Sequence, residues 1–172
     1  YGISSTTWGN GTRTGAPGED VPPADNSTAF GLKTIASGHQ CTSWGEEARS
    51  AGSKNCTAFG YKTNAQYADQ ATAFGNQTIA QGLNATAFGV STLAGGIQSV
   101  AWGESTEAKT NKNTTAFGEL TDATGTNATS FGLSTLAHGS QSVAWGESTK
   151  AQTGKNTTAW GISGEATGEQ AT

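Results

Sequence analysis

Phenylalanine and tryptophan occur in this chain only immediately before glycine, and these pairs recur at a nearly constant spacing. From Phe30 onward, consecutive aromatic residues of this kind are 14 or 15 residues apart. The pairs are Trp8-Gly9, Phe30-Gly31, Trp44-Gly45, Phe59-Gly60, Phe74-Gly75, Phe88-Gly89, Trp102-Gly103, Phe117-Gly118, Phe131-Gly132, Trp145-Gly146 and Trp160-Gly161. A short period held over most of a chain is typical of repeat architectures, in which each repeat buries its apolar face against its neighbours. The sequence therefore predicts a solenoid.

The composition does not suit an ordinary globular core. Leu, Ile, Val and Phe make up about 12% of the 172 residues, below the roughly 20% under which disorder is suspected. Disordered chains usually also carry a high net charge, whereas here charged residues are 13% and the net charge is −4. With the strict period, this composition predicts an all-β fold of stacked narrow coils. The weak acidity argues against a nucleic-acid partner, which requires clustered Lys and Arg.

Each coil can be numbered from its aromatic residue as position 0. Small residues at −3 and −1 alternate with Thr or Val at −2 and the aromatic residue at 0, and this period of two predicts a strand. Thr at +4 and Ala at +6 predict a second short strand. Glycine at +1 and often at +8 predicts two tight corners per coil, because glycine accepts positive φ.

Side-chain volume predicts which positions face inward. A two-strand coil of 14–15 residues encloses a lumen wide enough only for small side chains, so −3, −1 and +6 are expected inside and the residues at 0 and −2 outside. The aromatic residues of successive coils would then form one exposed apolar stripe along the solenoid, and an apolar stripe of this length marks an interface. Three-fold self-association would bury it, although a dimer or another stacked sheet would also do so. The expected axis residues are Phe30, Trp44, Phe59, Phe74, Phe88, Val100, Trp102, Phe117, Phe131, Val143, Trp145 and Trp160.

The period divides the chain into two unequal parts. Residues 1–25 are expected to form a partial or degenerate first coil with a protruding loop at 10–24, which is rich in glycine and proline. Residues 26–172 are expected to form about ten coils. Residues 91–106 recur almost unchanged as 134–149, which indicates duplication of a three-coil block. Both ends interrupt the repeat, so we expect an excised fragment of a longer repeat protein.

The coil resembles a known repeat. The hexapeptides that begin at Gln98 and Gln141, Gln-Ser-Val-Ala-Trp-Gly, are similar to the Asn-Ser-Val-Ala-Ile-Gly repeat of the YadA-like head of trimeric autotransporter adhesins. The resemblance covers roughly residues 26–172, with Phe or Trp in place of the usual Ile. It implies a left-handed parallel β-roll, assembled as a homotrimer and displayed on the bacterial cell surface through a stalk and an outer-membrane anchor. It also implies a role in virulence, through adhesion to host matrix, to cell-surface proteins or glycans, or to other bacteria in autoagglutination and biofilms.

Two cysteines occupy position −3 of adjacent coils, Cys41 and Cys56. Parallel rungs about 4.8 Å apart lie within the usual Cα range of a disulfide, so a bridge between them is expected. The alternative is a pair of free thiols that fill the lumen. Either role is structural.

The remaining polar residues do not form a catalytic or metal motif. An amide at −4 of every coil is expected to form a hydrogen-bonded ladder, and it accounts for six of the eight Asn-x-Ser/Thr sequons, at Asn10, Asn26, Asn55, Asn76, Asn84, Asn113, Asn127 and Asn156. His39 and His138 lack a partner at ligand spacing. Glu46, Glu104, Glu119 and Glu147 at +2 are expected to be solvated turn residues or a negative ridge. We therefore expect no enzyme activity, no cofactor and no metal.

Three functions remain compatible with the repeat. The expected one is an adhesin head that binds in several copies and so gains avidity. A second is an ice-binding solenoid that presents Thr at −2 and +4 as a regular array. A third is a structural spacer or fibre segment that carries a binding tip.

Overall fold

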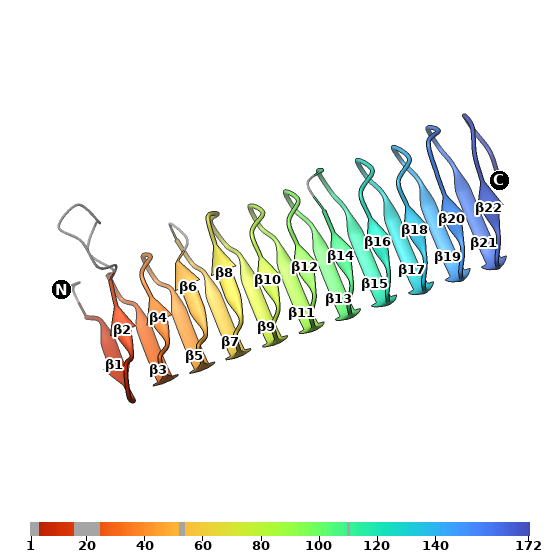
Figure 1. The fold of residues 1–172 in the computed structure, drawn as a ribbon. Coiled ribbons are helices and arrows are strands. Elements are labelled where there is room, and N and C mark those ends of the chain that lie inside the picture. The colour runs from red at the N-terminus through yellow and green to blue at the C-terminus, as the bar shows by residue number, and fades with distance from the viewer. Residues whose placement is uncertain (1–3, 16–24, 52–53, 110) are drawn as a thin grey trace.

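The chain folds into a parallel β-solenoid in a computed structural model that describes residues 4–15, 25–51, 54–109 and 111–172 (Figure 1). Within these residues the strands form two 11-stranded parallel sheets. The aromatic sheet contains β1 (Thr6–Trp8), β3 (Thr28–Leu32), β5 (Thr42–Glu46), β7 (Thr57–Tyr61), β9 (Thr72–Asn76), β11 (Thr86–Val90), β13 (Val100–Glu104), β15 (Thr115–Glu119), β17 (Thr129–Leu133), β19 (Val143–Glu147) and β21 (Thr158–Ile162). The outer sheet contains β2 (Arg13–Thr14), β4 (Ile35–Ala36), β6 (Arg49–Ala51), β8 (Asn64–Gln66), β10 (Ile79–Ala80), β12 (Leu93–Ala94), β14 (Glu107–Ala108), β16 (Asp122–Ala123), β18 (Leu136–Ala137), β20 (Lys150–Ala151) and β22 (Glu165–Ala166).

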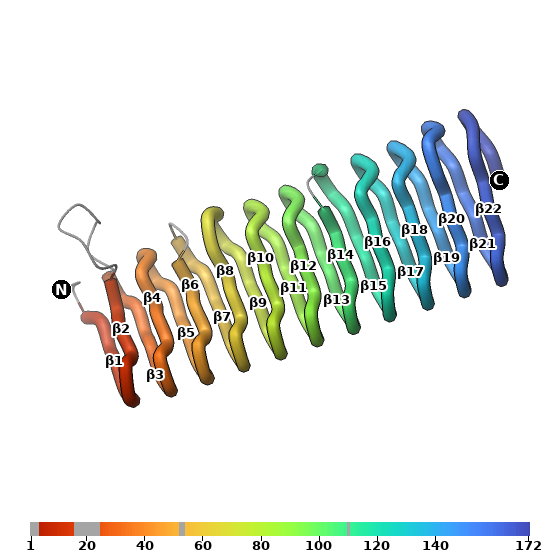
Figure 2. Tube along the Cα trace, viewed as in Figure 1, coloured from red at the N-terminus to blue at the C-terminus, as the bar shows by residue number. Residues whose placement is uncertain are grey.

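Each strand pairs in register with the equivalent strand of the next coil. In the aromatic sheet, Phe88 pairs with Trp102, and Trp102 pairs in turn with Phe117. The coils therefore stack in one direction along the molecule (Figure 2). The predicted all-β parallel solenoid with coils of 14–15 residues is confirmed.

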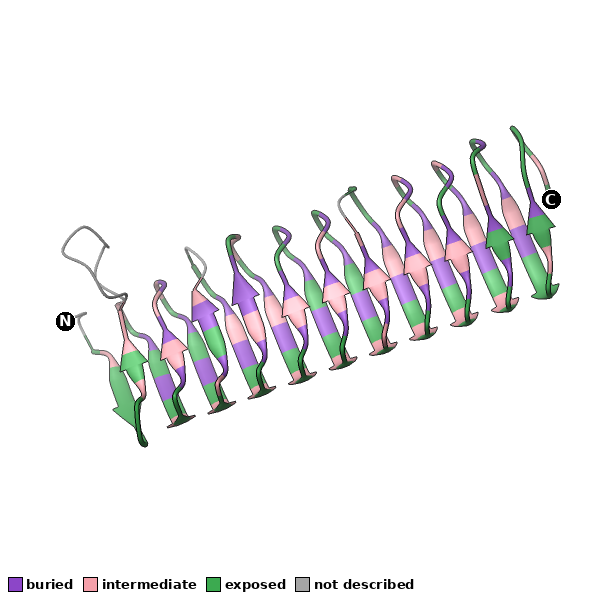
Figure 3. Cartoon of the chain, viewed as in Figure 1, coloured by how far each residue is buried: buried purple, intermediate pink, exposed green. Residues whose placement is uncertain are grey.

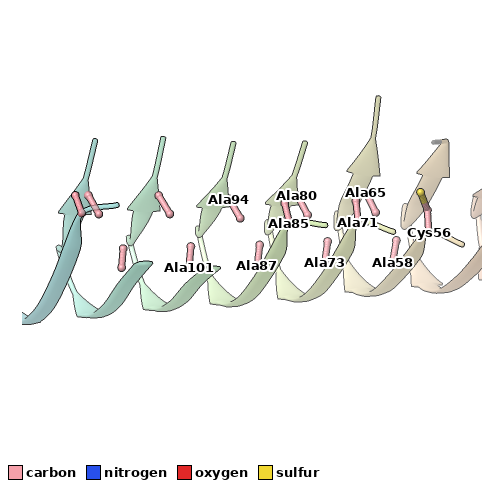
Figure 4. Close-up of a cluster of buried hydrophobic side chains, with 14 of the residues drawn as sticks. Cys56, Ala58, Ala65, Ala71, Ala73, Ala80, Ala85, Ala87, Ala94 and Ala101 are labelled. Carbon is pink, nitrogen blue, oxygen red and sulfur yellow. The ribbon is translucent and has the colours of Figure 1, made fainter. Parts of the chain in front are cut away.

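Small side chains fill the space between the two sheets. Alanines at −1 and +6, such as Ala87 and Ala94, are fully buried, and Figure 4 shows these alanines from successive coils pointing into a common lumen. The positions assigned to the interior, −3, −1 and +6, are confirmed. The sequence interpretation missed a fourth inward column, at +4. Its threonines are at most 1% exposed: Thr34, Thr63, Thr78, Thr92, Thr106, Thr121, Thr135 and Thr149.

The first corner depends on the glycine at +1. Gly103 has φ +134°, and a Cβ at this position would lie 1.8 Å from the carbonyl oxygen of Gly118 in the next coil. No side chain fits so close to a neighbouring backbone, and L-residues rarely adopt this φ. The predicted glycine corner at +1 is therefore confirmed. The corner is completed two residues later by Ser105, whose φ is also positive, at 52°.

The second corner differs from the prediction. The expectation of positive φ for glycine at +8 is wrong for Gly38, Gly82, Gly96, Gly125 and Gly139, and it holds for Gly168, whose φ is 103°. At Gly82 the constraint is close packing, because a Cβ would lie 1.8 Å from the carbonyl oxygen of Gly96. The left-handed residue of this corner is instead the amide at −4, for example Asn113 with φ 56°. Asn adopts this conformation more readily than most residues.

The first coil extends further than the sequence indicated. Trp8 pairs with Phe30, and Arg13 and Thr14 pair in register with Ile35 and Ala36. Part of the stretch assigned to a loop at 10–24 therefore belongs to the first coil. The remainder of that stretch, residues 16–24, lies outside the described residues.

Candidate binding surface

The aromatic residues form one continuous column on the exposed face of the aromatic sheet. Their exposed fractions run from 37% at Phe30 and Phe117 to 72% at Trp8, and Figure 3 marks them as exposed bands that alternate with buried ones along the strands. Consecutive rings from Trp8 to Trp145 have centroids 4.8–5.8 Å apart. The structure thus brings all the nominated axis aromatics together on one face.

The residues at −2 lie beside this column on the same face. Val100 is 37% exposed, and Val143 is half-buried. Near the C-terminal end, a hollow of about 410 Å³ is lined by Val143, Trp145, Gly146, Thr158, Trp160 and Gly161. The surface is therefore a shallow apolar groove bordered by rings, and it contains no charged side chain at positions −2 or 0.

The threonines at +4 do not contribute to any surface, because they point into the lumen. An ice-binding array built from the −2 and +4 columns is therefore incompatible with the structure. Only the −2 column remains outside, where it shares its face with the aromatic rings. The period of two holds in the second strand, where Thr at +4 lies on the same inward side as Ala at +6.

Cys41 and Cys56 are both buried and are not joined by a disulfide, so the expected bridge is wrong. Equivalent positions in adjacent parallel strands project side chains in the same direction, whereas a disulfide requires the two Cβ atoms to converge to about 3.8 Å. The Cys56 backbone N–H donates instead to the Cys41 sulfur at 3.4 Å, and the Cys56 thiol donates to the Ala68 carbonyl at 3.1 Å. The side-chain hydrogen bond with Cys56 and burial both raise the pKa of the Cys41 thiol.

The amides at −4 are exposed along the second corner. The expected ladder is seen between one pair, in which Asn113 Nδ2 donates to Asn127 Oδ1 at 2.8 Å. Positive φ at all ten positions gives a second reason for the amide column. The sequons at these positions therefore follow from the corner geometry.

Both histidines lie near a carboxylate that the sequence interpretation missed. His39 Nδ1 is 3.5 Å from Asp25 Oδ2, and His138 Nε2 is 3.8 Å from Asp122 Oδ2. Each carboxylate belongs to the preceding coil and lies 14 or 16 residues before its histidine. A separation of about one coil was therefore the sequence signal that could have identified these pairs. Among the described residues, no group of three or more His, Cys, Asp or Glu side chains is arranged to hold a metal ion.

Lys109 and Asp122 form a small ionic cluster on the outer sheet. Lys109 Nζ lies 3.4 Å from Asp122 Oδ2 and also contacts Glu107. The hydrogen bond to Glu107 raises the pKa of Lys109, and the nearby Asp122 charge adds to this effect. The acidic residues at +2, Glu46, Glu104, Glu119 and Glu147, are exposed and belong to the first corner.

Comparison with known families supports the sequence resemblance. The YadA head domain repeat, in two copies per match, matches residues 51–78, 67–92, 80–103, 110–135 and 123–146. Together these matches cover slightly more than half of the chain. No curated protein matches the chain. The described part of the chain contains no helix with the length and hydropathy of a membrane-spanning segment.

Proposed function

Because the chain belongs to the YadA head domain repeat family, we propose that it is the trimeric head of a surface adhesin, which binds its partners without catalysis. The family suggests an adhesin on the cell surface. The threefold assembly, the binding of a ligand and the attachment to an outer-membrane anchor are the elements of this function that we propose beyond the family assignment.

The aromatic column is the observation that carries this proposal. Taking about 200 Å² for a whole aromatic side chain, the exposed fractions of the eleven rings correspond to roughly 1,000 Å² per protomer. A stable interface buries about 800 Å² per partner, and the largest apolar patch on a typical monomer is about 300–600 Å². The column is therefore as large as an interface and larger than a monomer usually leaves in water.

A closed ring of three copies would cover the column along its whole length. The column is narrow, one ring per coil, so three columns around a common axis place each layer of rings in mutual contact. A ring with closed symmetry also leaves no free copy of the surface, which prevents open-ended association. The outer sheet stays available to partners.

The outer surfaces support multivalent binding. Outward positions in the outer sheet differ from coil to coil, as at Ile79, Leu93 and Glu107. In a trimer every such surface is present three times, so weak contacts combine into avidity. The proposed partners are host matrix or cell-surface proteins, glycans, or the same head on other bacteria.

Two measurements test the proposal separately. Sedimentation equilibrium should give a mass three times that of the 17.4 kDa chain, and a stable monomer or dimer would overturn the threefold assembly. Latex beads coated with the trimer should adhere to matrix-coated or cell-coated surfaces, or clump with one another. Trimeric beads that bind none of these surfaces, while beads coated with a matrix-binding control adhere, would overturn adhesion.

A further inference from the structure

The two corners of the coil form opposite long edges of the solenoid (Figure 1). We call positions +2 and +3 the first-corner edge and position −5 the second-corner edge. Glu104, the last residue of β13, and Ser105, which follows it, belong to the first-corner edge. Lys112, which precedes the left-handed Asn113, belongs to the second-corner edge.

Both edges carry charges, and ion pairs form along an edge. Glu47 lies 3.7 Å from Lys33 and 4.0 Å from Lys62, all on the first-corner edge. Among the described residues no ion pair joins the two edges, and six exposed charged residues take part in no ion pair: Lys54, Glu104, Lys112, Glu119, Glu147 and Lys155. These side chains are available to a neighbouring molecule.

Ring closure fixes which residues of the two edges meet. About half a coil separates a first-corner residue from the second-corner residues before and after it in the sequence. Coils are about 4.8 Å apart along the stacking axis. These residues therefore differ in position along that axis, here called height, by about half that distance. A closed ring around an axis parallel to the coil stack preserves height and brings one edge of each copy against the other edge of the next. Each first-corner residue therefore faces the two second-corner residues of the next copy that flank it in sequence.

The charges on the facing residues are complementary. Glu104 faces the next copy's Lys112, and Glu119 faces the same lysine from the other side. Glu147 faces the next copy's Lys155. Near the N-terminal end, the facing sets are Lys33 with Asp25 and His39, Glu47 with His39 and Lys54, and Lys62 with Lys54 and Asp69, so the two lysines each face one acidic and one basic residue.

Apolar residues match apolar residues in the same alignment. Val90 on the first-corner edge is 43% exposed, and Leu83 and Ile97 on the second-corner edge are 42% and 39% exposed. Val90 lies between these two residues in the sequence, so it faces both on the next copy. Only the alignment without an axial shift places both Leu83 and Ile97 against Val90, and Ile97 then also faces Glu104 on its other side.

From this complementarity we propose that the first-corner edge of each copy binds the second-corner edge of the next copy. The partner is a second copy of this chain, aligned without an axial shift. This contact rests on the proposed trimer and adds what the aromatic column alone lacks, because similar rings in every coil would tolerate a one-coil slip. The in-register contact makes more unlike pairs than a contact slipped by one coil in either direction, which keeps only some of these pairs and brings Glu47 against Asp69 or Asp25 of the next copy.

Cross-linking tests the predicted neighbours directly. Val90→Cys combined with Ile97→Cys, in a chain with Cys41→Ala and Cys56→Ala, should give covalent trimers on oxidation. The two introduced cysteines lie at opposite corners of one coil and cannot bridge within a chain. The matched control pairs Val90→Cys with Lys150→Cys on the outer sheet, and it should remain uncross-linked.

Charge reversal provides a second test. Lys112→Glu should raise the protein concentration at which half of the chains are trimeric at least tenfold in low salt. The increase should be smaller in high salt because salt screens the charges. Adding Glu104→Lys and Glu119→Lys to this variant should restore trimer formation, whereas Lys150→Glu alone should have little effect on the wild-type trimer. A wild-type trimer with neither cross-links nor a Lys112→Glu effect would overturn the edge contact alone. A monomeric wild-type chain would overturn the trimer and the edge contact together.

Discussion

Phe74 and Phe88 stack face to face, with ring centroids 4.8 Å apart and an interplanar angle of 2°. They belong to adjacent coils and pair in register across β9 and β11. The ring separation equals the spacing of parallel strands, so the backbone stacking sets the aromatic stacking. The resulting column remains open to solvent on its outer side, and this relationship underlies the first prediction.

Phe88→Asp should abolish trimer formation at about 10 µM, since burying a carboxylate in an apolar layer costs several kcal/mol and a trimer would contain three. Sedimentation velocity would show the change in mass. The matched control is Gln81→Asp, at an exposed position on the opposite side of the coil, which should leave the trimer intact. Equal loss of trimer in both variants would contradict the assignment of the interface to the aromatic face.

Ala101→Leu should lower the free energy of unfolding by about 1–3 kcal/mol or more, because Ala101 is fully buried in a lumen lined by small side chains. Urea unfolding monitored by tryptophan fluorescence would measure this loss. Gln81→Leu adds a side chain of the same kind at an exposed position and should change stability by less than about 0.5 kcal/mol. Tolerance of Ala101→Leu would mean that the lumen has more room than the alanine packing indicates.

Gly146→Ala should destabilise the chain more than Gly161→Ala. Both glycines have positive φ, at 132° and 100°, so both substitutions introduce backbone strain. Only at Gly146 would the new Cβ meet a neighbour, the carbonyl oxygen of Gly161 at 1.9 Å, since nothing lies within 4 Å of a Cβ at Gly161. Thermal unfolding of the two variants would separate steric contact from strain, and a larger loss for Gly161→Ala would show that strain dominates.

The thiols should be unreactive toward a thiol reagent in the folded protein and react only after denaturation, because both are buried. Cys41 also has a raised pKa, so the folded state holds its proton above the ordinary value of about 8.5. Its contribution to stability is complete below that value and falls as the pH rises above it, by up to about 1.4 kcal/mol per pH unit. Urea unfolding between pH 7 and 10 should show this decline, and Cys41→Ala should remove it.

Deletion of residues 103–145 should give a shorter chain that still folds and forms trimers. The deletion joins Trp102 to Gly146, which occupy consecutive positions of the same repeat, so three coils are removed without a change in register. Circular dichroism and sedimentation would check folding and assembly. Adhesion that falls with the removed coils supports binding along the head, whereas unchanged adhesion would support the spacer function.

The aromatic-glycine period was sufficient to predict the parallel solenoid, its coil length and three of its inward columns. These features are local, because a 14-residue coil with Gly at +1 has room inside only for Ala, Ser, Cys or Thr. The column at +4 was missed, although it lies two residues before the inward Ala at +6 and the period of two therefore indicated it. Residue type alone did not indicate it, because Thr34 faces inward and Thr28 faces outward, with positive φ at Gly31 and Lys33 in the turn between them.

The disulfide and the histidine partners show the other limit of sequence reasoning. Cys41 and Cys56 are in adjacent rungs as expected, but parallel strands direct their side chains alongside each other and not toward each other. His138 comes near Asp122 only because stacked coils place residues 16 apart on one face. The sequence by itself determined the repeat, the stacking and the presence of an apolar column, since these follow from period and volume. Only the tertiary structure decided the direction of each side chain at the corners, because left-handed residues turn the backbone there by amounts that residue type alone does not specify.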